Sequence, residues 1–300
     1  MNAVVKRFPL RLDTRGARVD MTHGSGGRAM AQLIEELFLK HFDNQLLRQG
    51  NDQAAFDVSA GRMVMSVDGH VISPLFFPGG DIGSLAVHGT LNDVAMSGAR
   101  PLYLSAGFIL EEGFPLADLD RIVASMGCAA AEAGVPVVTG DTKVVEKGKG
   151  DGVFITTTGI GVVPDGVVIS GDRAQPGDKI LVSGSIGDHG VAIMSSRENL
   201  AFETSIESDS APLHKLVHRM IETAPGSTAC AIPPVAVLPQ HSTNWPCNQG
   251  SACGLWSRPY PSRPQSAPLA NCSASIPSMW PTRASSFVFV HPGMQNGCCR

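Results

Sequence analysis

The chain has 300 residues, a length that accommodates two domains of ordinary size. Its formal net charge of −4 gives no basic surface for nucleic acid or an anionic membrane, so we expect neither as a partner. No apolar run is long enough to span a bilayer, and residues 1–20 lack the apolar core of a secretory signal. These features predict a cytoplasmic protein.

The composition changes abruptly after Gly226. Residues 227–300 contain six of the seven cysteines and all three tryptophans, but no Asp, Glu or Lys. The cysteines lack the paired spacing of a zinc site, and a cytoplasmic setting disfavours disulfides. Proline recurs throughout this segment and no helix or strand period is sustained. We therefore expect residues 227–300 to be a disordered tail.

The first motif along the chain is glycine-rich and reads MTHGSGGR over residues 21–28. Its backbone N–H groups suit phosphate oxygens, but its spacing matches neither a Walker A loop nor a dinucleotide fingerprint. A plain turn before a helix explains it as well, and a lone histidine such as His23 is more often a surface residue. An amphipathic helix is predicted over residues 29–42.

Strands and helices then alternate. The expected order is strand 62–68, helix 84–97, strand 102–109, helix 116–133, a strand over 135–139 that ends at Gly140, and strand 153–161. This order predicts an α/β domain that ends near Pro164. A second unit begins with strand 179–183 and continues with helices over 191–197 and 213–222.

Acidic residues recur near the ends of these elements, at Asp52, Asp68, Asp93 and Asp141. An exposed turn acid gives the same sequence, and Asn92–Asp93 on a helix fits a structural hydrogen-bond network about equally well. Carboxylates that converge repel one another, and magnesium with a polyphosphate is the simplest way to stabilise such a cluster.

Asp141 and Lys143 form an acid–x–base triplet immediately after the strand that Gly140 is predicted to end. Alternation along an extended segment places both side chains on the same face. A carboxylate that holds magnesium, next to an ammonium that meets a phosphate or moves a proton, suits nucleotide chemistry. The alternative is a solvated charge pair beside a mobile loop.

Together these motifs resemble the HypE-type hydrogenase maturation proteins, in the superfamily of aminoimidazole ribonucleotide synthetase and selenophosphate synthetase. The matching stretches run in order from about residue 20 to residue 226: HGSGG (23–27), NDQAAF (51–56), SVDGHVISPLFFPGGDIG (66–83), NDVAMSGARP (92–101), GDTKVV (140–145) and SGSIGDHG (183–190).

The resemblance implies a two-domain α/β, PurM-like fold. Its N-terminal sheet domain dimerises into a barrel-like interface where ATP binds, and the C-terminal α/β domain is incomplete here. The implied divisions begin with a Gly-rich segment and helix over residues 1–40 and the ATP-binding and dimerisation domain over residues 41–165. The start of the C-terminal domain follows over residues 166–226, and the tail over residues 227–300.

The resemblance also implies an activity, the ATP-dependent dehydration of a carbamoylated C-terminal cysteine to a thiocyanate. The cyanide serves nickel–iron hydrogenase assembly. The implied partners are a second copy of the chain, a HypF-type carbamoyltransferase and a HypC–HypD-type scaffold complex.

The same resemblance assigns the site. ATP with Mg²⁺ is implied as the cofactor, with Asp52, Asp68, Asp93 and Asp141 on the metal and nucleotide, and Asn92 beside them. Gly24, Gly26 and Gly27 would cover the phosphates, and Lys143 and His23 are the catalytic candidates.

The chain departs from the family after Gly226. The family's Pro-Arg-Ile-Cys tail, which carries the acceptor thiol, is absent, and Cys298 and Cys299 lack its context. In a shifted reading frame, each triplet joins the third base of one codon to the first two bases of the next. Read in this frame, the codons from Ala229 permit LRDPTRGGLATTLNEL and those from Leu269 permit CELLGIDPLYVANEGKL, which resemble later motifs of the family. We infer one uncorrected frameshift near residues 226–229, and expect impaired catalysis and aggregation-prone apolar faces.

Two alternatives stay open. The chain is either an enzyme of this family or a non-catalytic remnant that dimerises and binds nucleotide. The alternative enzyme is a selenophosphate synthetase, which needs a reactive Cys or selenocysteine ahead of a lysine where this glycine-rich segment reads HGSGGR. Nothing specific favours a thiamine-phosphate kinase.

Overall fold

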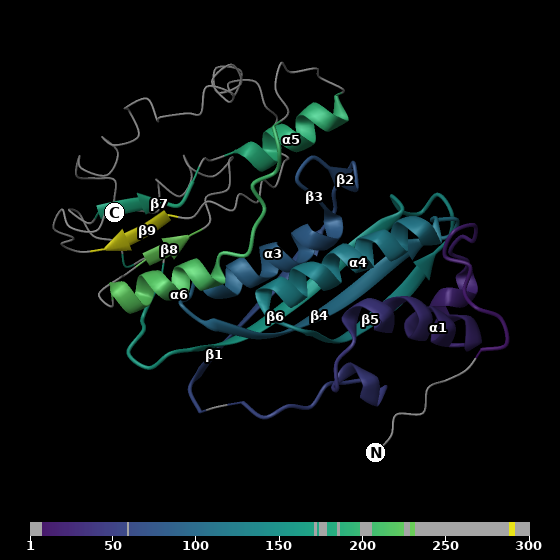
Figure 1. Ribbon diagram of the computed structural model, residues 1–300, viewed down its shortest axis with the longest axis horizontal. Helices are drawn as coiled ribbons and strands as arrows, with labels where there is room; N and C mark the ends of the chain where they lie inside the picture. Colours follow the sequence, from purple (N-terminus) through teal and green to yellow (C-terminus); the bar gives the residue numbers. More distant parts are fainter. Residues whose placement is uncertain are drawn as a thin grey trace. The chain divides into compact units, whose positions relative to one another are not determined.

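The computed structural model forms two compact units (Figure 1). It describes residues 8–58, 60–170, 173, 179–184, 187–198, 206–224, 229–231 and 288–291. The first unit comprises residues 1–72, 81–94 and 101–162, and the second comprises residues 73–80, 95–100 and 163–300. No helix in the described ranges is long and apolar enough to cross a membrane.

The first unit is built on a four-stranded sheet with the strand order β1-β6-β4-β5. The strands are β1 (Arg62–His70), β6 (Val153–Val163), β4 (Arg100–Glu111) and β5 (Val137–Val145). β4 and β5 run parallel, with Gly107 opposite Asp141 and Ile109 opposite Lys143. Burial alternates along β6, which shows that one face of the sheet carries the core.

Two helices lie across this sheet in Figure 1, α3 (Ile82–Ala95) and α4 (Leu116–Ala133). The predicted helix over 116–133 is confirmed, and it ends at Gly134, whose φ of 75° is the left-handed cap that glycine favours. The core consists of fully or almost fully buried aliphatic side chains, among them Leu91, Leu104, Leu110, Leu119 and Ile122.

The N-terminal helical segment follows the predicted range of 29–42 closely. It consists of η1 (Met21–Gly24), α1 (Arg28–Leu33), a π turn η2 (Ile34–Phe38) and α2 (Leu39–Phe42), followed by η3 (Leu47–Gln49). α2 packs on α4 where a Cβ on Gly127 would lie 2.5 Å from the carbonyl oxygen of His41. Lys40 and His41 both bind Asp120, at 3.0 and 2.8 Å.

The prediction that Gly140 ends its strand is wrong. β5 runs through Gly140 to Val145. A Cβ at Gly140 would lie 2.3 Å from the carbonyl oxygen of Ala106 on β4. The glycine is therefore needed for close pairing of β4 and β5, which a sequence cannot distinguish from a strand end.

The second unit contains a hairpin of β2 (Phe76–Phe77) and β3 (Gly80–Asp81), and the helices α5 (Asp188–Arg197) and α6 (His214–Thr223). Its apolar cluster is formed by buried residues around α6, namely Ala95, Ile169, Leu213, Val217, Ile221 and Ala224. A three-stranded antiparallel sheet has the order β7-β9-β8, from β7 (Lys179–Val182), β9 (Val288–His291) and β8 (Ala229–Ala231).

The expected disordered tail over 227–300 lies mostly outside the described residues. Its described part forms β8 and β9, two short strands in a segment where the sequence indicated no sustained period. β9 pairs with β7 from Lys179 opposite His291 to Val182 opposite Val288. Backbone hydrogen bonding, which requires no particular side chains, allows such pairing without a sequence signal.

Candidate nucleotide site

Asp141 and Lys143 lie on the same face of β5, as alternation predicted. Lys143 Nζ donates to Asp141 Oδ1 at 3.0 Å, and the side chains of Lys143 and Asp141 are 62% and 60% exposed. An exposed ion pair contributes about 0–1 kcal/mol to stability. Both charges are therefore open to a ligand at little energetic cost.

His23 lies in η1 and is 7% exposed, so it is not the surface residue that a lone histidine usually is. The backbone N–H of Asp20 donates to His23 Nδ1 at 3.0 Å, while Asp20 Oδ1 accepts from the N–H of Thr22 at 2.8 Å. This reciprocal capping box uses Nδ1 as an acceptor. A chemical role for His23 would therefore fall to Nε2.

The glycines of the HGSGG motif differ in their surroundings. A Cβ at Gly24 would lie 2.5 Å from the backbone nitrogen of Val144, so η1 packs directly on β5 beside Lys143. Gly26 has φ of 78°, and a Cβ at Gly26 or Gly27 would meet nothing within 4 Å. The backbone at Gly26 and Gly27 is therefore open to close approach by a ligand.

A second group of polar residues lies where β1 faces α3. Asp68 is 6% exposed and Asn92 is 4% exposed. Ser66 Oγ donates to Asp93 Oδ2 at 3.3 Å, and burial raises the pKa of Asp93 above its usual value. β1 continues two residues past Asp68, so this acid lies within the strand and not at its end.

His70 adds a buried polar network behind Asp68. His70 Nε2 lies 3.6 Å from Asp68 Oδ2 and 3.0 Å from Thr157 Oγ1. Thr157 Oγ1 also lies 2.5 Å from Thr90 Oγ1 and donates to the carbonyl oxygen of Ala86 at 3.1 Å. Burial lowers the pKa of His70 to about 4.

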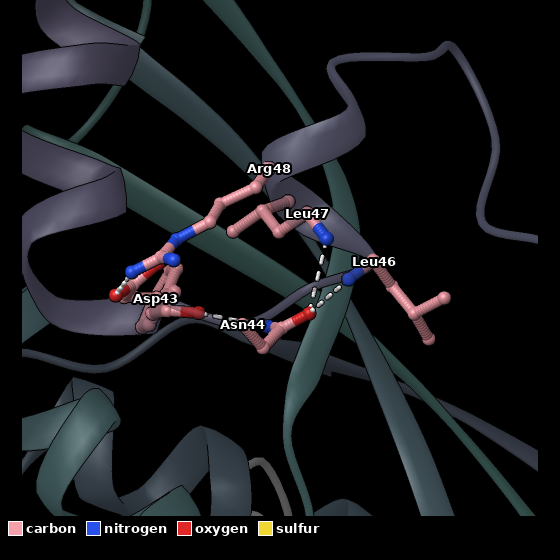
Figure 2. A network of polar contacts seen from close by, with 6 residues as sticks. Asp43, Asn44, Leu46, Leu47 and Arg48 are labelled. Carbon is pink, nitrogen blue, oxygen red and sulfur yellow. Dashed lines mark hydrogen bonds and ion pairs between the residues drawn. The ribbon is translucent and has the colours of Figure 1, made fainter. Parts of the chain in front are cut away.

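Asp52 is exposed and lies outside the helices and strands. The segment before it is anchored by Asn44, whose Oδ1 accepts from the N–H groups of Leu46 and Leu47 at 3.1 and 3.0 Å (Figure 2). Asn44 Nδ2 donates to the carbonyl oxygen of Val137 at 2.8 Å, which ties this turn to the first residue of β5.

The predicted acids do not gather in one place within a single chain. Asp68 and Asp93 lie at the β1 edge of the sheet, Asp141 lies on β5 at the opposite edge, and β6 and β4 lie between them. Within the described ranges, no group of three or more His, Cys, Asp or Glu side chains is arranged to hold a metal ion. A shared magnesium role for the four acids stays a prediction.

Sequence reasoning did not single out His70, Thr157 or Thr90. His70 lies inside the quoted SVDGHV stretch, where it looks like an ordinary strand residue. Thr157 is separated from His70 by 87 positions, and only the pairing of β1 with β6 brings them together.

Family models match this chain over most of the described residues. The model for the AIR synthase related protein N-terminal domain matches residues 50–163, and that for the corresponding C-terminal domain matches residues 175–230. Together with the sheet and helices above, these matches define an AIR synthase related protein of PurM-like fold.

Individual relatives narrow the assignment. Carbamoyl dehydratase HypE of Cupriavidus necator is 70% identical over 216 residues, which cover 72% of this chain and 62% of that protein. A crystal structure of the hydrogenase maturation protein HypE with ATP shares 42% identity at a TM-score of 0.79, covering 91% of this chain and 81% of that one. A HypE–HypF complex shares 41% identity at a TM-score of 0.68, covering 87% and 84%.

The chain belongs to the HypE family of hydrogenase maturation proteins. This confirms the resemblance and the PurM-like fold class inferred from the sequence. The chain spans about 62% of the length of the Cupriavidus necator relative.

Proposed function

We propose that this chain descends from, and retains the nucleotide site of, an ATP-dependent carbamoyl dehydratase that supplies cyanide for nickel–iron hydrogenase assembly. The observation that carries the proposal is the exposed Asp141–Lys143 pair on β5, against which η1 packs at Gly24, with the open backbone of Gly26 and Gly27 following in the chain. The names of the relatives and the ATP bound in one solved HypE structure support it.

The reaction converts an S-carbamoyl thiol and ATP into a thiocyanate, ADP and inorganic phosphate. The amide oxygen attacks the γ-phosphorus and ADP leaves. The carbon–oxygen bond then breaks, phosphate departs, and the amide nitrogen gives up its two protons to form the nitrile. Phosphoryl transfer of this kind needs positioning and charge neutralisation above all.

The residues present suit those needs. The backbone N–H groups at Gly24, Gly26 and Gly27 would bind phosphate oxygens, because a Gly-rich turn forms an anion-binding concavity. Lys143 would neutralise charge that develops on the transferred phosphoryl group or move a proton. His23 would act through Nε2, since Nδ1 is held by the capping box.

Magnesium fits this site without a three-residue protein cage. Mg²⁺ usually keeps several waters and binds through one or two carboxylates plus substrate phosphates. The exposed carboxylate of Asp141, the buried carboxylate of Asp68 and the half-buried carboxylate of Asp93 would provide such ligands at the two sheet edges, with Asp52 and Asn92 as further oxygen donors. When bound, the ion would neutralise the phosphate charge.

A homodimer would bring these edges together. β1 presents Met63, Met65 and Val67 on one face, and these side chains are 47%, 69% and 60% exposed; Ile109 on β4 is 42% exposed. An exposed apolar sheet face of this kind marks an association site. If two copies pack through this face, the β1 edge of one copy would approach the β5 edge of the other.

Further partners follow from the family. A HypE–HypF complex has been solved, and we propose a HypF-type carbamoyltransferase as the donor of the carbamoyl group. A HypC–HypD-type scaffold is proposed as the acceptor of cyanide. The alternative function is nucleotide binding without turnover, which the change in composition after residue 226 favours.

Two measurements on the full chain separate these functions. We expect isothermal titration calorimetry to show magnesium-dependent ATP binding by the wild-type chain. Lys143→Met should weaken this binding. The control variant Lys149→Met, in the exposed β5–β6 loop, should leave it unchanged. An absence of ATP binding by the wild-type chain would overturn the proposal. ATP hydrolysis that depends on a carbamoylated substrate favours the dehydratase, whereas binding without hydrolysis favours the remnant.

A further inference from the structure

In the buried network behind Asp68, a donor and an acceptor can be assigned to each hydrogen bond. Thr157 and Thr90 are fully buried and His70 is 3% exposed, so bulk solvent does not reach them and protein groups supply their hydrogen-bond partners. The Thr157 hydroxyl donates its single proton to the carbonyl oxygen of Ala86 at 3.1 Å. Its oxygen then has only acceptor capacity for its other two neighbours.

Those neighbours must therefore be donors. Thr90 Oγ1 lies 2.5 Å from Thr157 Oγ1, and Thr90 is the donor of this pair when the Thr157 proton is directed to Ala86. His70 Nε2, at 3.0 Å, must also carry a proton that points to Thr157 Oγ1. This conclusion holds whether or not Nδ1 is protonated, because it depends only on the donor count at Thr157.

From this geometry we infer that His70 is a positioning residue for Asp68, with its Nε2–H orientation set by Thr157 and Thr90. The inference rests on the proposed nucleotide site, in which Asp68 is a ligand. Nε2 lies 3.6 Å from Asp68 Oδ2, beyond hydrogen-bond distance but within Coulombic range. A ring nitrogen with a hydrogen attracts the carboxylate oxygen, whereas a bare lone pair would repel it.

The network links residues from three different elements of the first unit. His70 belongs to β1, Thr157 to β6 and Thr90 to α3. Asp68 is thus oriented by the packing of α3 on the sheet. Removing the Thr157 hydroxyl should release the His70 ring without altering the Asp68 side chain itself.

The first test observes the tautomer directly. In ¹⁵N-histidine-labelled full-length protein, the His70 signals are assigned by their loss in the His70→Gln variant. We expect the Nε2 resonance of His70 to be that of a protonated ring nitrogen in the wild-type chain. A His70 ring with a bare Nε2 would overturn the inference, because Thr157 would then be the donor.

The second test compares hydroxyl deletion with hydroxyl retention at one position. Thr157→Val is expected to weaken ATP binding roughly 10-fold in the presence of magnesium, with little change in its absence, while Thr157→Ser stays close to wild type. Melting temperatures of the two variants control for folding. The measurement is ATP titration calorimetry with and without MgCl₂.

The outcomes distinguish this inference from the proposed function. If the wild-type chain binds no ATP, the proposed function is overturned together with the role of His70 toward a nucleotide. If the wild-type chain binds magnesium–ATP and Thr157→Val lowers the melting temperature but leaves the magnesium dependence unchanged, only the positioning role is overturned.

Discussion

Asp68 and Asp141 lie on the two opposite edge strands of one four-stranded sheet, β1 and β5, with β6 and β4 between them. Adjacent strands are about 4.8 Å apart, so three strand spacings separate the backbones of these residues by roughly 14 Å. One magnesium ion cannot bind both carboxylates within a single sheet. In the proposed homodimer, each copy would supply one of the two acids to a nucleotide site.

The apolar face of β1 should control both dimerisation and nucleotide binding. Met65→Glu places a charge on a side chain that is 69% exposed, so the free subunit should fold, but burying the charge in a dimer is costly. We expect a monomer in analytical ultracentrifugation and ATP binding weakened more than about 10-fold, equivalent to about 1.4 kcal/mol.

Leu216→Glu on α6 is the matched control, because Leu216 is also an exposed aliphatic residue, at 44%. It should leave the oligomeric state and ATP affinity unchanged. A Met65→Glu variant that dimerises as well as the wild type would contradict the proposed interface.

Asp141 should contribute to the magnesium dependence of binding. Asp141→Asn keeps the size of the side chain and removes the charge, so we expect ATP affinity in the presence of magnesium to fall by about 10-fold or more. Asp151→Asn, in the exposed loop between β5 and β6, serves as control. Calorimetric titration at several magnesium concentrations is the measurement. An unchanged magnesium dependence in Asp141→Asn would show that this residue has no metal role.

Gly24 and Gly27 should respond differently to the same substitution. Gly24→Ala places a Cβ 2.5 Å from the backbone nitrogen of Val144, which should force η1 away from β5 and cost about 1–3 kcal/mol of unfolding free energy. Gly27→Ala meets nothing within 4 Å and should leave stability nearly unchanged.

ATP binding distinguishes the two glycines further. If phosphates approach the backbone at Gly27, the added methyl group should weaken ATP binding in Gly27→Ala although urea denaturation shows normal stability. Equal affinity in Gly27→Ala and wild type would exclude close phosphate contact at this position.

His189 should make the second unit sensitive to acid. Its Nδ1 lies 2.8 Å from Ser208 Oγ and its ring packs against Phe77 at 5.4 Å. Burial lowers the pKa of His189 from 6.5 to about 4. The unfolded chain therefore binds more protons between these values, so stability is complete above pH 6.5 and falls as the pH decreases toward 4.

For His189 alone, we expect a loss of about 2 kcal/mol between pH 7.5 and pH 5.0. Urea denaturation across this range is the measurement. His189→Gln should reduce the dependence by about half, because buried His70 has the same lowered pKa and still contributes. His218→Gln on α6, a part-exposed residue, should retain the full dependence. An undiminished slope in His189→Gln would assign the acid sensitivity to other groups.

The reading frame near residues 226–229 gives a prediction at the level of DNA. Resequencing the codons for Pro225 to Cys230 distinguishes a natural frameshift from a base that was missed or added in reading the DNA. With such a base corrected, the chain should contain LRDPTRGGLATTLNEL and CELLGIDPLYVANEGKL and show carbamoyl-dependent ATP hydrolysis. With the reading frame confirmed, we expect no turnover and at most nucleotide binding by the first domain.

The sequence by itself determined the local elements and the family. The helix over 116–133 followed from its apolar period and terminal glycine, and the shared face of Asp141 and Lys143 followed from strand alternation, because both depend on residues close in the chain. The ordered set of glycine-rich and acidic motifs was specific enough to indicate the family that the comparisons show.

Only the tertiary structure decided which strands are neighbours. The order β1-β6-β4-β5 separates Asp68 from Asp141, makes Gly140 a close-packing residue inside β5, and brings Thr157 to His70 across 87 positions. These relationships depend on pairings between distant segments, which alternation and helical period along one strand or helix do not encode.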